Sequence, residues 1–148
     1  MELFRTTGRI RYGRDSYSVV IVDPEIGNYY RSFIPRHIMW SIPLWQPHIT
    51  VTRTGVEKIV NREAWEKYEG QEFVVGYSPH IMIGFTYIWL PAFSKELEEI
   101  RLELGLSRFF DRFRGFHITI ANMKGTLSQG RCMDYGGVPP PTKNYVDI

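Results

Sequence analysis

The chain has 148 residues, 43% hydrophobic and 15% aromatic, which is enough apolar material for one globular domain over residues 1–148 and excludes a disordered chain. Its net charge of +2 is too small for a protein that coats duplex nucleic acid, whereas a small anionic ligand in a cleft would suit it. Cys132 is the only cysteine, which excludes an internal disulfide and a thiolate metal cage. The apolar run from Ile81 to Phe93 is too short and too interrupted to cross a bilayer, and residues 1–14 contain no apolar signal segment. We therefore expect a cytoplasmic protein without a membrane partner.

The first half of the chain predicts three strands and one helix. Asp23 predicts the N-cap of the helix, Pro24 suits its first position, and Pro35 ends or kinks it. Residues 40–47 hold two prolines and two tryptophans, which predicts an entry loop rather than a regular central strand. The predicted strands are residues 8–13, 17–22 and 47–51. The first two are expected to form a hairpin.

The second half predicts helices and strands in alternation. The helix after Ser94 has the stronger signal, because Leu97, Ile100 and Leu104 form one apolar face and Gly105 closes it. Shorter helical pieces are predicted over residues 62–68, after an Asn61 cap, and 107–113. The predicted strands, which are rich in β-branched and aromatic residues, are 73–77, 80–90 and 116–120.

One short pattern occurs twice, as Pro47–Val51 in the first half and Phe116–Ile120 in the second. Each copy is a His-x-Thr between apolar residues, and on a strand its histidine and threonine would point to one face while the apolar residues enter the core. A lone histidine on a strand is more often structural or exposed. We interpret His37, after Pro35, as a surface residue at a helix end, and His80, after Ser78 and Pro79, as a structural residue in a turn. Two near-identical copies favour a shared ligand instead. The candidate catalytic residues are His48, Thr50, His117 and Thr119.

The order of these elements predicts an α+β fold with two pseudo-symmetric lobes. Each lobe would be a small antiparallel sheet with an outer helix, and the two motif strands would face one another across a central cleft. Residues 125–148 are rich in glycine and proline, which predicts a C-terminal loop, either a floppy terminus or a flap over the cleft.

Paired imidazoles suit phosphodiester cleavage, because one can accept a proton while the other donates one at the same pH. The threonine hydroxyls can donate hydrogen bonds to phosphate oxygens as negative charge grows on them. The chain offers no His-x-His, HExxH or carboxylate cluster near these strands, so we expect no metal and no other cofactor.

The paired His-x-Thr motifs resemble those of the 2H phosphoesterase superfamily. Within it, the chain is most similar to the phage anti-CBASS nucleases, which degrade the cyclic oligonucleotide signals of bacterial immunity. Three segments carry this similarity: the opening of the chain through Tyr12–Arg14, then Trp45–Gly55 and Gly115–Asn122. The resemblance implies a bilobal fold, with the two His-x-Thr pairs at the centre of the groove. It also implies metal-independent cleavage of 3′,5′ linkages in cyclic di- and trinucleotides through attack by a ribose 2′-hydroxyl, without telling which histidine is the base.

Substrate contacts are predicted from chemistry, because nucleobases stack on aromatic rings and phosphates attract cations. The stacking candidates are Tyr12, Tyr77 and Tyr145. The phosphate candidates are Arg53 and Lys124, just beyond the motif strands. We expect Trp65, Phe85, Phe109 and Phe110 to belong to the core, and Trp45 and Trp89 stay undecided between core and ligand.

Two alternatives stay open. The first keeps the chemistry and changes the substrate, as in an RNA-end 2′,3′-cyclic phosphodiesterase or a 2′,5′-oligoadenylate hydrolase. The second is a non-enzyme, a sponge that sequesters cyclic nucleotides through the same groove. The cyclic oligonucleotide is the expected partner, and the oligomeric state stays open.

Overall fold

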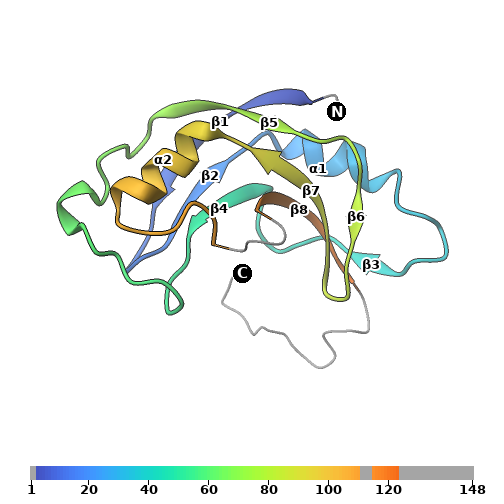
Figure 1. Ribbon diagram of the computed structural model, residues 1–148. Coiled ribbons are helices and arrows are strands. Elements are labelled where there is room, and N and C mark those ends of the chain that lie inside the picture. Colours follow the sequence, from blue (N-terminus) through green and yellow to red (C-terminus); the bar gives the residue numbers. More distant parts are fainter. Residues whose placement is uncertain (1–2, 111–114, 124–148) are drawn as a thin grey trace.

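The computed structural model describes residues 3–110 and 115–123, which form two α-helices, one 3₁₀ helix and eight strands (Figure 1). The strands are β1 (Phe4–Tyr12), β2 (Ser18–Ile21), β3 (Trp40–Ser41), β4 (His48–Thr52), β5 (Glu72–Tyr77), β6 (Met82–Ile83), β7 (Tyr87–Phe93) and β8 (Phe116–Met123). The helices are α1 (Pro24–Arg31), α2 (Lys95–Glu103) and the 3₁₀ helix η1 (Arg62–Ala64). Among the described residues, none of the helices has the length and apolar character needed to cross a membrane.

Six of the strands close into an antiparallel barrel. Around the barrel the order is β8-β4-β2-β1-β5-β7, and pairing of β7 with β8 completes the circuit. The two-residue strands β3 and β6 extend the sheet beside β8 and β7. The α+β class predicted from the sequence is therefore confirmed, in the form of a closed antiparallel barrel with two α-helices.

The barrel consists of two halves with the same order of elements. Without the two-residue strands β3 and β6, the first half runs β1-β2-α1-β4 and the second runs β5-β7-α2-β8, so each is an antiparallel strand pair, a helix and a motif strand. The halves meet at two seams, which differ in extent. Six residue pairs are in register between β1 and β5, whereas one pair joins β4 to β8. The two motif strands are thus neighbours in one sheet, whereas the sequence pattern predicted that they face one another across a groove. The predicted two-lobed arrangement is not confirmed.

Both predicted α-helices begin at the predicted caps. The Asp23 side chain accepts a hydrogen bond from the backbone N–H of Glu25 at 2.9 Å, and the Ser94 hydroxyl accepts one from Leu97 at 3.2 Å. Gly105 follows α2 with φ of +85°, a conformation that closes helices and favours glycine. The helices lie at opposite ends of the sheet, α1 against β8 and α2 against β4 (Figure 1).

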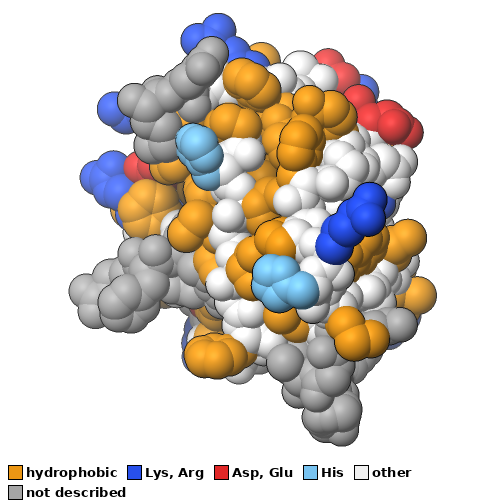
Figure 2. Space-filling view, turned by 90° about the vertical axis from the view of Figure 1, so that its right-hand side faces the viewer, with side chains coloured by type: hydrophobic (Ala, Val, Ile, Leu, Met, Phe, Trp, Pro, Cys, Tyr) orange, Lys and Arg blue, Asp and Glu red, His pale blue; other side chains and the backbone are white. Residues whose placement is uncertain are grey.

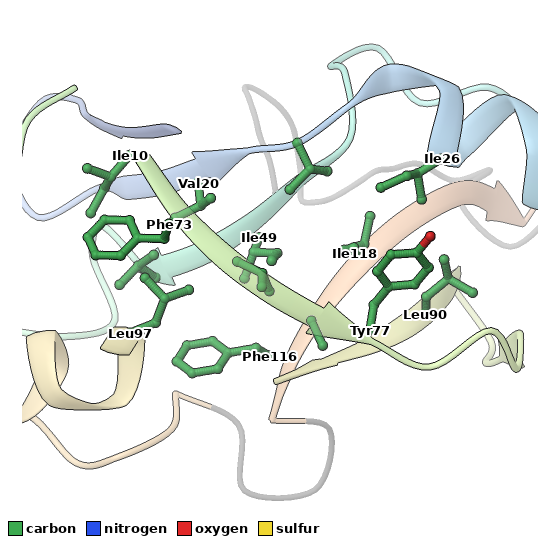
Figure 3. Close-up of a cluster of buried hydrophobic side chains, with 14 of the residues drawn as sticks. Ile10, Val20, Ile26, Ile49, Phe73, Tyr77, Leu90, Leu97, Phe116 and Ile118 are labelled. Atoms are coloured by element: carbon green, nitrogen blue, oxygen red, sulfur yellow. The ribbon is translucent and has the colours of Figure 1, made fainter. Parts of the chain in front are cut away.

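The core lies inside the barrel and is built from the apolar faces of the strands (Figure 3). Along β4 and β8, apolar residues at every second position are fully buried, which confirms the alternation predicted from the sequence. The predicted face of α2 also enters this core, through Leu97, Ile100 and Leu104. The core residues without exposed surface include Ile10, Val20, Ile49, Val51, Val75, Ile88, Leu90, Ile118 and Ile120.

Some apolar side chains stay on the surface. Figure 2 shows the end of the molecule where α1, β3 and β6 lie, and hydrophobic side chains cover much of this face. Phe85 is among the exposed residues, with 91% of its surface accessible, so its assignment to the core was wrong. It lies in the turn between β6 and β7, because the predicted strand over residues 80–90 is in fact a hairpin.

The predicted helix over residues 62–68 is reduced to the single turn η1. Asn61 makes no capping hydrogen bond; its Nδ2 donates instead to the Glu103 carbonyl at the end of α2 at 3.0 Å. Glu66 then adopts φ of +67°, which a continuing α-helix excludes. The helix predicted over 107–113 does not form at residues 107–110, and residues 111–114 lie outside the described part, as does the predicted loop over 125–148.

Candidate active site

The pairing of β4 with β8 brings the two His-x-Thr motifs together. Ile49 is in register with Ile118 on the core face, so the residues on either side of this pair share the outer face of the sheet. Extended by one residue on either side of this single pair, the antiparallel register puts each histidine opposite the threonine of the other strand. Residues opposite one another have Cβ atoms about 4.5–5.5 Å apart, and diagonal neighbours are about 7–8 Å apart. The four side chains of this motif quartet are His48 and Thr50 from β4, and His117 and Thr119 from β8.

All four side chains of the motif quartet are partly buried, between fully buried apolar neighbours on the same strands. Well-packed strands hold their backbones rigidly, so the polar side chains leave the sheet in fixed directions. The quartet is therefore anchored in the core and still accessible to a ligand.

Both histidines are oriented in the same way by their own strands. The Nδ1 atom of His48 is 2.9 Å from the Gln46 carbonyl oxygen, and Nδ1 of His117 is 3.2 Å from the Gly115 carbonyl oxygen. In both cases the carbonyl belongs to the residue two positions earlier. A carbonyl can only accept, so Nδ1 carries the proton and Nε2 carries the lone pair of the neutral ring. Gly115 adopts φ of +64°, a conformation that favours glycine at the entry to β8.

The environment of His48 favours the neutral imidazole. Burial lowers the pKa of His48 below its ordinary value of 6.5, and the hydrogen bond to the Gln46 carbonyl acts in the opposite direction without cancelling the shift. A histidine that is neutral near pH 7 can accept a proton, which is the requirement for a general base.

Trp89 joins the motif quartet from the neighbouring strand β7. It is in register with Thr119, and its ring lies 6.3 Å from the His117 ring at an interplanar angle of 66°. The sequence left Trp89 undecided. The alternation along β7, where Ile88 and Leu90 are fully buried, signals that Trp89 faces outward, but only the pairing of β7 with β8 reveals the neighbour.

The two described tyrosines among the predicted stacking residues lie away from the motif quartet. Tyr12 packs edge-on against Trp65 with ring centroids 4.8 Å apart, and burial raises its pKa to about 12. Tyr77 is only 8% exposed and packs between Tyr30 and Phe4 on the core side of the sheet.

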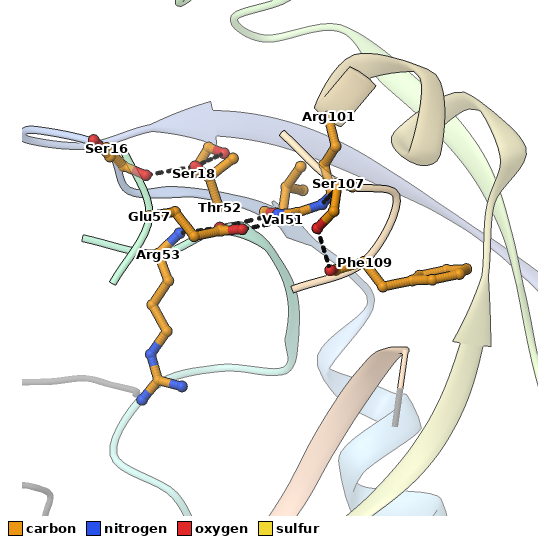
Figure 4. Close-up of polar contacts among 9 residues, drawn as sticks. All are labelled: Ser16, Ser18, Val51, Thr52, Arg53, Glu57, Arg101, Ser107 and Phe109. Atoms are coloured by element: carbon orange, nitrogen blue, oxygen red, sulfur yellow. Dashed lines mark hydrogen bonds and ion pairs between the residues drawn. The ribbon is translucent and has the colours of Figure 1, made fainter. Parts of the chain in front are cut away.

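One of the two predicted phosphate-binding residues lies directly after the end of β4. Arg53 follows β4, and its guanidinium lies 5.2 Å from the centre of the Phe110 ring. Figure 4 shows its side chain pointing away from the buried polar contacts around Arg101. Lys124, the second predicted phosphate ligand, and Tyr145, the third stacking candidate, both lie outside the described residues.

Within residues 3–110 and 115–123, no group of three or more histidine, cysteine or acidic side chains is arranged to hold a metal ion. The side chains gathered at the candidate site are two imidazoles, two hydroxyls and an adjacent indole. Comparisons with protein-family models, curated proteins and solved structures gave no match.

Proposed function

We propose that the chain is a phosphodiesterase of the 2H type, in which His48 and His117 transfer protons on either side of one phosphate. The observation that carries the proposal is the register of β4 and β8, which sets each histidine opposite a threonine of the other strand on one accessible face. The proposed role of the threonines is to donate hydrogen bonds to the non-bridging phosphate oxygens.

In the proposed reaction, His48 is the general base and His117 the general acid. Nε2 of neutral His48 takes the proton of a ribose 2′-hydroxyl, and the 2′-oxygen forms a bond to the adjacent phosphorus. The bond from phosphorus to the 5′-oxygen breaks, and Nε2 of protonated His117 donates its proton to that oxygen. The product is a 2′,3′-cyclic phosphate, which water then opens to a 3′-phosphate. The lowered pKa of His48 supports this assignment.

The proposed substrates are cyclic di- and trinucleotides, in the cytoplasm of a bacterium infected by a phage. The resemblance to the anti-CBASS nucleases supports this choice. The repeated order of antiparallel strand pair, helix and motif strand supports a distant relation to the two-lobed 2H fold. Trp89, beside His117 and Thr119, is the proposed platform for one nucleobase, because base stacking on an aromatic ring contributes about 1–3 kcal/mol.

The test is incubation of the purified protein, with and without EDTA, with cyclic di- and trinucleotides and with RNA ending in a 2′,3′-cyclic phosphate. We expect linear fragments from the cyclic nucleotides, detected by chromatography. Faster opening of the RNA ends would replace this function with the RNA-end activity, and cleavage of added 2′,5′-oligoadenylate would point to that hydrolase. Release of intact cyclic nucleotide after denaturation would identify a sponge, and loss of cleavage with EDTA would contradict a metal-free mechanism.

A further inference from the structure

Two arginines donate hydrogen bonds to backbone carbonyls of the motif strands, at the same position in each strand. Nη1 of Arg31 donates a hydrogen bond to the Ile120 carbonyl at 2.8 Å, and Nη1 of Arg101 donates one to the Val51 carbonyl at 2.6 Å. In both strands the accepting residue lies three positions after the motif histidine. We call these two residues the crossed arginines.

The crossed arginines connect the two halves of the barrel reciprocally. Arg31 is the last residue of α1 in the first half and reaches β8 of the second half, whereas Arg101 belongs to α2 in the second half and reaches β4 of the first. Each motif strand is therefore held by the helix of the opposite half. Between β4 and β8 themselves a single residue pair is in register. The hydrogen bonds of the two arginines are therefore additional contacts that fix the motif strands relative to one another.

Each guanidinium is itself held in place. Arg101 has no exposed surface; it donates to both carboxylate oxygens of Glu57, and its Nε donates to the Ser107 carbonyl at 2.9 Å (Figure 4). Nη2 of Arg31 donates to the Asn28 side-chain oxygen at 2.5 Å. A guanidinium that makes several hydrogen bonds to ordered partners keeps a fixed position and orientation.

Gly27 makes room for the Arg31 guanidinium. A Cβ atom at this position of α1 would lie 2.8 Å from Nη1 of Arg31 and 3.1 Å from Cγ of Pro47, the residue before His48. The first distance is too short, so the guanidinium would have to move. The space left by Gly27 thus lets Arg31 pass beside the first motif strand to reach the second.

We propose that Arg31 and Arg101 are positioning residues that set the separation of the two imidazoles over one phosphate. The inference rests on the proposed function. Proton transfer requires donor and acceptor atoms about 2.6–3.2 Å apart, and a displacement of about 1 Å can lower a rate by about 10². Because His48 and His117 come from different halves, their separation depends on contacts that cross the seam, and the crossed arginines make two of them.

The first test measures turnover of a cyclic dinucleotide by Arg31→Gln, Arg31→Lys and Gly27→Ala variants. Arg31→Gln should lower kcat by at least about tenfold with a nearly unchanged KM, because positioning is lost in the transition state rather than in binding. Gly27→Ala should lower kcat although Arg31 is still present, and Arg31→Lys should recover part of the loss. Arg36→Gln, which changes an exposed arginine in the loop after α1, is the matched control and should keep wild-type kcat.

The second test does not depend on activity, because it follows the imidazole signals of both histidines by NMR. Arg31→Gln should shift the ring signals of His117 more than those of His48, and Arg101→Lys should do the reverse. Unchanged ring signals together with unchanged kcat in Arg31→Gln would overturn the inference and leave the proposed function standing. If the wild-type protein cleaves none of the nucleotides, the proposed function fails and the ring signals alone decide the positioning role.

Discussion

At the scale of single residues, each motif histidine is oriented by the backbone that precedes it in the chain. Nδ1 of each histidine meets the carbonyl oxygen of the residue two positions earlier, so the same tautomer is set twice by local geometry. The pattern that identified these residues is local as well, because alternation along one strand tells which side chains share a face. Trp89 illustrates the limit of such patterns. Its place beside His117 depends on which strand lies next to β8, and no periodicity within residues 87–93 contains that information.

The first residue-scale prediction concerns the two imidazoles. His48→Ala and His117→Ala should each lower turnover of a cyclic dinucleotide by about 10² to 10⁴, the usual contribution of one general acid or base. Both variants should stay folded, because neither side chain is part of the buried core. Turnover assays with circular dichroism as the folding check decide this, and His80→Ala, at an exposed position, is the control. Near wild-type rates in either variant would remove the mechanism.

The second residue-scale prediction concerns pH and stability. Because burial lowers the pKa of folded His48 below 6.5, the unfolded chain binds a proton that the folded chain does not bind at pH values between the two pKa values. This contribution to stability is present in full above pH 6.5 and is lost as the pH falls through the folded-state pKa. The free energy of unfolding should therefore decrease less steeply on acidification in His48→Gln than in the wild type, measured by urea denaturation between about pH 5 and pH 8. Equal slopes in His48→Gln and the wild type would contradict the prediction.

At the scale of helices and strands, the same capping signal has different outcomes in Asp23 and Asn61. The Asp23 carboxylate faces its own helix and caps it, whereas the Asn61 amide is engaged by the end of α2, forty-two residues further along the chain. Helix ends can be predicted where the capping group has no competing partner. Where a distant segment supplies a competing hydrogen-bond partner, the capping residue is present in the sequence but the predicted helix does not form over its full length.

The element-scale prediction uses this cap. Asp23→Ala should lower the free energy of unfolding by about 1 kcal/mol, because the N–H of Glu25 loses its acceptor at the start of α1. Asp23→Ser keeps an acceptor and should lose only a few tenths of a kcal/mol, from the lost charge at the helix N-terminus. Chemical denaturation of the three proteins measures the difference. Equal stability of Asp23→Ala and the wild type would show that the cap contributes nothing.

At the scale of the whole molecule, closure of the barrel decides which faces are inside. The seam between β1 and β5 joins the halves over six residue pairs. At the seam between β4 and β8 one residue pair is in register, and the candidate site lies there. An active site at such a seam combines groups from two halves, so its geometry is a property of the assembled barrel. The crossed arginines span this seam, and the sequence contains no signal for the carbonyl that each one reaches.

The whole-molecule prediction tests how tightly neighbouring strands of the barrel pack, at the contact between β1 and β2. A Cβ atom on Gly8 of β1 would collide with Cγ1 of Val20 and lie 2.9 Å from the backbone oxygen of Ile21. Gly8→Ala should therefore destabilise the fold by about 1–3 kcal/mol, the usual cost of overpacking. Gly76→Ala on β5 is the matched control, because the nearest atom to its added Cβ would be 3.5 Å away. Equal urea midpoints for the two variants would contradict tight packing between β1 and β2.

The sequence alone determined the local properties of this protein: the two motif strands and their polar faces, the hairpin of β1 and β2, both helix caps and the apolar face of α2. Each of these depends on residues a few positions apart, whose preferences act wherever the segment lies. Tertiary structure decided the neighbours: β4 beside β8 in one closed sheet, Trp89 beside His117, and each arginine on the opposite half. These contacts join residues far apart in the chain, and their register is set by the packing of the complete core, which no single segment contains.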